Sequence, residues 1–290
     1  MARHTELLII DAQNDFCDLP EAWCPPDPLT GRRAAPALPV PGAHADLLRL
    51  AGLIGQAGTR IDGITVTLDA HHRHDIAHPG YWLAEHGAAV PAFTPISAAQ
   101  VRAGAFRPVV AAEFDRTLAY LDALEAAGRY ALMVWPVHCQ LGSWGRGLHA
   151  AVLAACNAWE DARHVPVRVV DKGSFPWSEH YSALQAEVPD AADPSTLLNR
   201  PLLARLDRAD TLLIAGQASS HCVKATVEHL VEHLPSRRPE RLVLLTDCMS
   251  PVAGFEPQAT AFLAAMRAQG VQTLTLTQVQ VAHRLLAAAP

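Results

Sequence analysis

Short runs of aliphatic and β-branched residues recur along the chain, with polar residues between them. They occupy residues 6–10, 63–67, 130–134, 165–170, 211–215, 241–245 and 273–276. Most of these runs are apolar on both faces, which is typical of strands that are buried in a parallel sheet. The pattern therefore predicts a central sheet that is mostly parallel.

Helical periodicity fills several of the intervals between these runs. It covers residues 44–56, 111–127, 148–159, 224–233 and 258–269. Gly128 and Gly270 stand where two of these helices should end, just before the next strand. Alternating strands and helices predict an α/β protein with three α/β/α layers and right-handed crossovers. We expect residues 1–290 to form a single domain.

Three stretches have little periodicity and are rich in Pro, Gly or polar residues: 20–41, 83–108 and 175–200. All three should lie near one edge of the sheet, where long loops often carry function. We interpret them as insertions that build a lid or a pocket wall; surface decoration is the alternative.

Composition limits the classes of partner. The formal net charge is −6 and no basic block stands out, which argues against nucleic acid and anionic membranes. The first apolar run, residues 7–10, is too short for a signal sequence or a membrane span. We therefore expect a cytoplasmic protein with a small-molecule substrate, whose six cysteines are free thiols.

Reactive side chains directly follow five of the predicted strands. In chain order these are Asp11; Asp69 and His71; Trp135 and His138; Lys172; and Cys222. Ligands bind beyond the carboxyl ends of the strands in open α/β sheets. The sequence thus predicts an active site at this edge.

Cys222 follows a strand and a turn of small residues, where a helix should begin. The helix N-terminus should lower the thiol pKa and favour the thiolate, and its free N–H groups suit an oxyanion hole. Asp11 ends an apolar strand and can act as a base. The alternatives are a buried, inert Cys222, a turn or cap role for Asp11, and a snorkelling surface role for Lys172.

Four histidines and two aspartates occupy residues 69–78. Imidazoles with one carboxylate suit Zn²⁺, Fe²⁺ or Mn²⁺. The spacing matches neither a zinc finger nor H-E-x-x-H, so a polar loop is the alternative.

Taken in order, five motifs follow the first five predicted strands. They are D-x-Q-N-D-F, D-x-H, W-P-x-H-C-x-x-G, K-G and G-x-A-x-x-x-C-V-x-x-T, within residues 6–226. Together they resemble nicotinamidases and, more broadly, the isochorismatase-like hydrolases. The resemblance implies a catalytic triad of Asp11, Lys172 and Cys222. It also implies a cis peptide between Gln217 and Ala218, with the N–H groups of Ala218 and Cys222 as oxyanion donors.

The same resemblance implies a divalent metal, with zinc preferred over iron or manganese, that holds the pyridine nitrogen of the substrate. Matching ligand positions are Asp69, His71 and His138. His78 is the best match for a fourth ligand, and His74 is the alternative.

Phe16, Trp135 and Tyr181 match positions that wall the substrate ring, with ordinary core packing as the alternative. Ser219 and Ser220 replace the Thr-Asp pair that often precedes the nucleophile, and the insertions lengthen the chain. Both departures affect the substrate rather than the triad. The presence of Cys222 argues against the isochorismatase branch, which does not use this cysteine.

The predicted function is that of a cysteine amidohydrolase releasing ammonia from nicotinamide or a related heteroaromatic amide. One alternative is an amidase for another small amide, of the carbamoyl or maleamate type. Others are a catalytically silent family member that binds a small ligand, and a metallohydrolase in which the metal activates water. By analogy with the family, we also expect a homo-oligomer.

Overall fold

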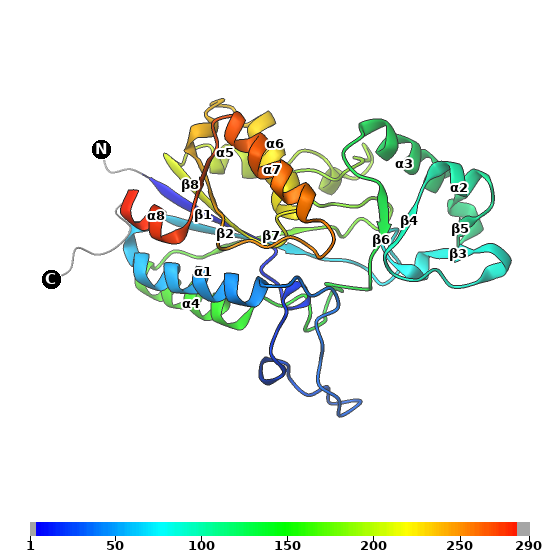
Figure 1. The fold of residues 1–290 in the computed structure, drawn as a ribbon, viewed down its shortest axis with the longest axis horizontal. Helices are drawn as coiled ribbons and strands as arrows, with labels where there is room; N and C mark the ends of the chain where they lie inside the picture. The colour runs from blue at the N-terminus through cyan, green and yellow to red at the C-terminus, as the bar shows by residue number, and fades with distance from the viewer. Residues whose placement is uncertain (1–3, 283–290) are drawn as a thin grey trace.

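The computed structural model describes residues 4–282. Its centre is a six-stranded sheet of order β10-β9-β8-β1-β2-β7, in which every neighbouring pair is parallel (Figure 1). The strands are β1 (Thr5–Ile10), β2 (Gly63–Asp69), β7 (Arg168–Lys172), β8 (Thr211–Gly216), β9 (Leu242–Leu245) and β10 (Gln272–Leu274). The predicted α/β fold with a mostly parallel sheet is confirmed.

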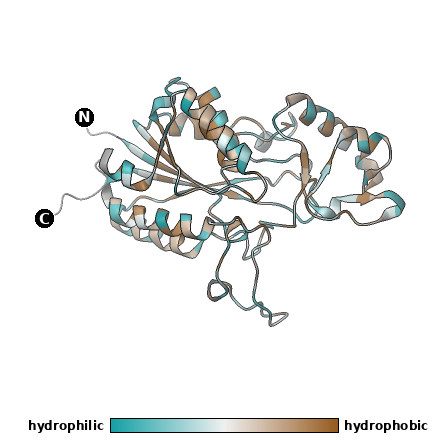
Figure 2. Ribbon diagram, in the orientation of Figure 1, coloured by the Kyte–Doolittle hydropathy of each residue, from teal (hydrophilic) through white to brown (hydrophobic). Residues whose placement is uncertain are grey.

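Helices cover both faces of this sheet. One layer holds α1 (Ala43–Ala57) and α4 (Ala150–Arg163). The other holds α5 (Arg200–Leu206), α6 (Cys222–His233) and α7 (Glu256–Ala268) (Figure 1). All residues of β1, β2 and β8 are buried between these layers, in agreement with their apolar sequences (Figure 2).

The prediction that residues 130–134 form a strand of the central sheet is wrong. Strand β6 (Leu132–Val134) instead pairs antiparallel with β4 (Thr94–Ile96) in a separate two-stranded sheet. The physical reason is a second apolar core. Leu132 and Val134 are buried there against α3 (Phe114–Ala127).

The second core gives regular structure to the predicted insertion 83–108. This stretch contributes to β3 (Trp82–Ala84), to β4, to α2 (Ala98–Arg102) and to β5 (Phe106–Pro108), all at the right of Figure 1. Strands β3 and β5 pair antiparallel with each other. The stretch is thus a small subdomain rather than a loop.

Two further expectations need correction at strand ends. The run 165–170 is not a buried strand: β7 lies at the edge of the sheet, and Val169 is 54% exposed. Residues 273–276 are split, because β10 ends at Leu274 and α8 (Leu276–Ala282) begins two residues later.

The other two insertions differ from each other. Residues 20–41 project from the body as a long loop (Figure 1) with a 3-10 turn at Glu21–Trp23. In contrast, residues 178–184 of the third insertion are buried. Within the part of the chain that is described, no helix is both long and apolar enough to cross a membrane.

Candidate active site

Four neighbouring strands of the sheet end at one place. Asp11 follows β1, Asp69 and Lys172 end β2 and β7, and Cys222 begins α6 after β8. Gly216 permits the close approach of the β8 and β1 ends, because a Cβ atom on it would lie 1.9 Å from the Ile10 carbonyl oxygen. The chain order of the strands therefore brings the predicted residues to one edge.

Lys172 lies at the centre of this group and is buried. Its Nζ atom is 2.9 Å from Asp11 Oδ2, 3.0 Å from Asp69 Oδ1 and 3.6 Å from Cys222 Sγ. It also donates a hydrogen bond of 3.0 Å to the carbonyl oxygen of His180. The structure thus brings together the three residues predicted as a catalytic triad.

Hydrogen bonds with Thr67 of β2 hold Asp11 in place. The Thr67 hydroxyl donates to Asp11 Oδ1 at 2.6 Å, and the Asp11 N–H donates to Thr67 Oγ1 at 3.1 Å. Asp11 Oδ2 forms an ion pair with Lys172 at 2.9 Å. A carboxylate oxygen has more than one lone pair, so Oδ2 can accept a further proton donor.

Burial dominates the protonation of the site. It raises the pKa of the Cys222 thiol well above its usual value, although the Lys172 charge opposes it. Burial also raises the pKa of Asp11, again against Lys172. Although burial disfavours the ammonium group, Asp11 and Asp69 raise the pKa of Lys172 well above its usual value.

The expected lowering of the thiol pKa by the helix N-terminus is therefore not found. Helix α6 does begin at Cys222, but desolvation of the thiolate outweighs the helix terminus and the Lys172 charge. The resting thiol therefore keeps its proton.

The turn before α6 supplies unpaired donors. The peptide between Gln217 and Ala218 is cis, as the resemblance implies. The N–H groups of Ala218 and Cys222 donate no hydrogen bond to any residue in the described range 4–282. Both residues line the pocket, so their N–H groups are available to an oxyanion.

Asp69, His71 and His138 form a buried cluster whose ligand atoms all lie within 4.8 Å of one another. The Nε2 atoms of the two histidines are 3.0 and 3.5 Å from Asp69 Oδ2. On the far side, Nδ1 of His71 contacts Asp75 Oδ2 at 2.9 Å, and Nδ1 of His138 contacts the Pro136 carbonyl oxygen at 2.8 Å. Such partners orient imidazoles for metal binding, so this donor set fits a divalent ion.

The two candidates for a fourth ligand, His78 and His74, differ in their positions. His78 is buried, and its Nε2 atom is 3.3 Å from Nδ1 of His138. A fourth ligand at His78 stays a prediction. His74 lies outside the cluster, where its Nε2 atom contacts Glu113 at 3.3 Å.

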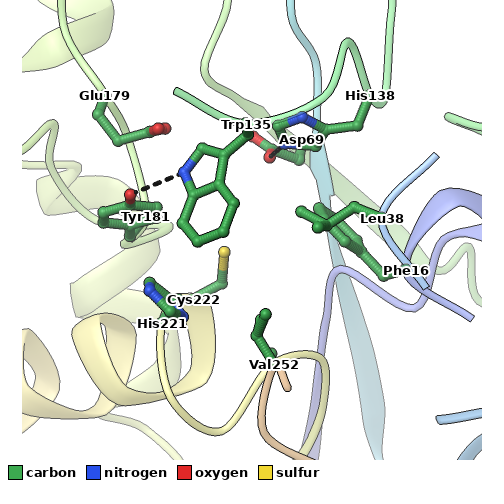
Figure 3. A pocket seen from close by; sticks show the side chains of 11 residues that line it. Phe16, Leu38, Asp69, Trp135, His138, Glu179, Tyr181, His221, Cys222 and Val252 are labelled. Atoms are coloured by element: carbon green, nitrogen blue, oxygen red, sulfur yellow. Dashed lines mark hydrogen bonds and ion pairs between the residues drawn. The ribbon is translucent and has the colours of Figure 1, made fainter. Parts of the chain in front are cut away.

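A pocket opens beside the Cys222 sulfur (Figure 3). The predicted ring-wall residues Phe16, Trp135 and Tyr181 all line it. The Trp135 indole N–H donates to the Tyr181 hydroxyl at 3.0 Å, which fixes one wall. The aromatic and apolar walls suit an aromatic ligand.

Some pocket residues carried no signal in the sequence. These are Leu38, Glu179, His221 and Val252. Leu38 and Glu179 come from the insertions 20–41 and 175–200, which therefore do contribute pocket wall. Glu179 Oε1 accepts the His180 N–H at 3.0 Å, whereas the buried Oε2 has no partner among the described residues.

The chain shares its fold with solved structures that are named nicotinamidases and isochorismatase-family proteins. No family model matches the sequence, and no curated protein matches it. Solved structures do match.

The yeast nicotinamidase Pnc1p bound to nicotinaldehyde has a TM-score of 0.61 at 19% identity, over 93% of this chain and 99% of that one. The nicotinamidase/pyrazinamidase of Acinetobacter baumanii has a TM-score of 0.59 at 18% identity, over 96% and 98%. The zinc complex of the Pyrococcus horikoshii pyrazinamidase has a TM-score of 0.51 at 17% identity, over 94% and 99%. At these identities the likeness establishes a shared fold.

Proposed function

We propose that this chain is a cysteine amidohydrolase that releases ammonia from nicotinamide or a related heteroaromatic amide. The observation that carries the proposal is the contact of Lys172 with both Asp11 and Cys222 at the base of an aromatic-walled pocket. Structures of similar fold are named nicotinamidases and pyrazinamidases, and one of them holds nicotinaldehyde. We also propose that residues 1–290 act as a single domain.

The residues have distinct roles in the proposed reaction. Asp11 accepts the thiol proton as Cys222 Sγ attacks the amide carbon. The N–H groups of Ala218 and Cys222 bind the oxyanion, and Lys172 stabilises the negative charge that develops on sulfur. Asp11 then gives its proton to the departing ammonia, which leaves a thioester on Cys222. Water hydrolyses the thioester with Asp11 as the base, and the carboxylic acid is released.

Asp69, His71 and His138 would hold the divalent ion, with His78 as a proposed further ligand. A bound ion at this place supplies a Lewis acid that can fix a ring nitrogen of the substrate. The zinc complex of the Pyrococcus horikoshii pyrazinamidase supports zinc. In this chain Asp69 also contacts Lys172, and the same carboxylate thus links the metal cluster to the triad.

The test is an assay of ammonia release over a panel of small amides, with and without a chelator. We expect release from nicotinamide and from related heteroaromatic amides, and less release after chelation. Turnover of only acyclic or carbamoyl amides would favour the alternative amidase. Tight binding of nicotinamide without ammonia release would favour a silent ligand-binding protein.

A further inference from the structure

Gln217 directly precedes Ala218, one of the two proposed oxyanion donors, and is buried. Its side-chain amide is held at both ends. Nε2 donates to Asp46 Oδ2 at 3.0 Å, and Oε1 accepts the Ser250 N–H at 3.2 Å. The Gln217 N–H donates to the Ile10 carbonyl oxygen at 2.8 Å. The proposed reaction gives none of these side chains a role.

Asp46 comes from a different layer of the fold. It lies in the first turn of α1, on the face of the sheet opposite α6 (Figure 1). The side chain is buried. Oδ2 accepts the Ser250 hydroxyl at 2.6 Å as well as the Gln217 amide, while Oδ1 pairs with the half-exposed Arg49. Because a buried carboxylate has lost its hydration, it depends on such donors and binds them strongly. Asp46 thus joins the turn before the nucleophile to the loop that follows β9.

The backbone of Ala218 is held on both sides. The Ser219 N–H donates to the Ser250 carbonyl oxygen at 2.9 Å, so the residue after Ala218 is tied to the same loop as the residue before it. The Ala218 carbonyl oxygen accepts the N–H groups of His221 at 3.0 Å and Val223 at 3.1 Å. Together these contacts set the direction of the Ala218 N–H. An oxyanion donor is effective when its direction is set before the reaction begins.

We propose that Asp46 is a positioning residue that, through Gln217 and Ser250, holds the Ala218 N–H in place for the oxyanion. The inference rests on the proposed function and deepens it. The role requires a hydrogen-bond acceptor at position 46 rather than a negative charge, because Gln217 and Ser250 both donate to the same oxygen atom. Loss of this acceptor should weaken the binding of tetrahedral states and leave the binding of the substrate ring unchanged.

The first test compares the kinetics of Asp46→Ala, which removes the acceptor, with those of Asp46→Asn, which keeps an amide oxygen for Gln217 and Ser250. We expect kcat to fall about 10-fold in Asp46→Ala with little change in KM, and to stay within about 2-fold of wild type in Asp46→Asn. Arg49→Ala is the matched control. It removes the other partner of the same carboxylate and should keep normal kcat.

The second test needs no turnover and uses nicotinaldehyde, the inhibitor held by the yeast nicotinamidase of similar fold. When the Cys222 thiol adds to an aldehyde, a C–S bond forms, the C=O double bond opens and the thiol proton passes to the oxygen. The tetrahedral adduct presents that oxygen to the proposed donors. Calorimetry on metal-loaded protein should show about 10-fold weaker binding of the aldehyde to Asp46→Ala. Binding of 3-methylpyridine, which has the ring but no carbonyl group, should not change.

Gln217→Met breaks the same contact from the other side, and it replaces Asp46→Ala if that variant does not fold. It should show the same losses of kcat and of aldehyde affinity.

Three results would overturn the inference while the amidase assignment stands. The first is wild-type kcat and aldehyde affinity in a folded Asp46→Ala or Gln217→Met enzyme. The second is an equal loss of kcat in Asp46→Asn and Asp46→Ala. The third is an equal loss of affinity for 3-methylpyridine and the aldehyde, which would indicate a general structural role. A wild-type enzyme that hydrolyses no heteroaromatic amide would instead refute the proposed function and this inference together.

Discussion

Lys172 connects the predicted catalytic triad with the predicted metal ligands. It contacts Asp11 and Cys222 on one side and Asp69, a predicted metal ligand, on the other. Two carboxylates this deeply buried need a nearby cation, because an unpaired buried charge is costly. The same ammonium therefore supports both the fold and the proposed chemistry, and a substitution has to separate the two effects.

Lys172→Ala should lower kcat by at least about 10²-fold, the scale seen when one electrostatic stabiliser of a transition state is lost. It should also lower the free energy of unfolding, because Asp11 and Asp69 lose their counter-charge. Lys172→Arg should not restore activity, because the planar guanidinium needs a different geometry. Steady-state kinetics and denaturant unfolding measure the two effects.

The chain offers a matched control, since Lys224 is its only other lysine. Lys224 pairs with Glu228 on α6, so Lys224→Ala should keep normal kcat. Near-normal kcat in a folded Lys172→Ala enzyme would show that the triad does not operate here.

At the scale of elements, the sequence predicts the strands and their order correctly where apolar periodicity and chain order determine the structure. Strand β8 is apolar on both faces, β1 mostly so, and β2 on one face. The order of these strands brings Asp11, Asp69 and Cys222 to one edge. Periodicity could not place β6, because a three-residue apolar strand suits the central sheet and the second core equally well.

The pocket side chains from the insertions were also beyond sequence reasoning. Glu179 has neither a periodic pattern nor a motif around it, and its position depends on the packing of residues 178–184. His221 adjoins the nucleophile, but its place in the pocket wall depends on packing against Tyr130 and Phe255, far along the chain. Such contacts arise from tertiary structure alone.

The third insertion contains a titratable group that makes stability depend on pH. Glu187 is buried, and burial raises its pKa to about 7, although Arg129 lies 3.5 Å away and opposes the shift. Because the folded state holds this proton more tightly, the contribution of Glu187 to stability is full below about pH 4.5. It is lost as the pH rises through 7.

Glu187→Gln removes this titration. From pH 4 to pH 8, the free energy of unfolding of the wild type should therefore fall, relative to that of the variant, by on the order of 3 kcal/mol. Denaturant unfolding at both pH values measures the shift. Glu232→Gln, the same substitution at an exposed position of α6, is the control. An equal pH dependence in Glu187→Gln and wild type would contradict the assignment.

At the scale of the whole molecule, the site is assembled from both cores. The central sheet supplies the triad and Asp69, while the segment that leaves β6 in the second core brings Trp135 and His138 to the same pocket. The cluster of Asp69, His71 and His138 thus joins the subdomain at the right of Figure 1 to the main sheet.

Protein purified without chelators should contain close to one equivalent of zinc, iron or manganese, as measured by elemental analysis. His71→Ala should lose the metal, because it removes one of three buried ligands. His74→Ala should retain it, because His74 lies outside the cluster. A metal-free wild-type protein with full activity would remove the ion from the mechanism.

The central claim is that Cys222 is the nucleophile, and replacing its sulfur by oxygen tests this most directly. Ammonia release from nicotinamide should be measured for the wild type and for Cys222→Ser at equal metal content. The thioester mechanism predicts that the serine enzyme loses at least about 10³-fold in kcat, because Asp11 and Lys172 are placed to activate a thiol. A Cys222→Ser enzyme that keeps most of its activity would contradict the account and would assign the chemistry to a metallohydrolase.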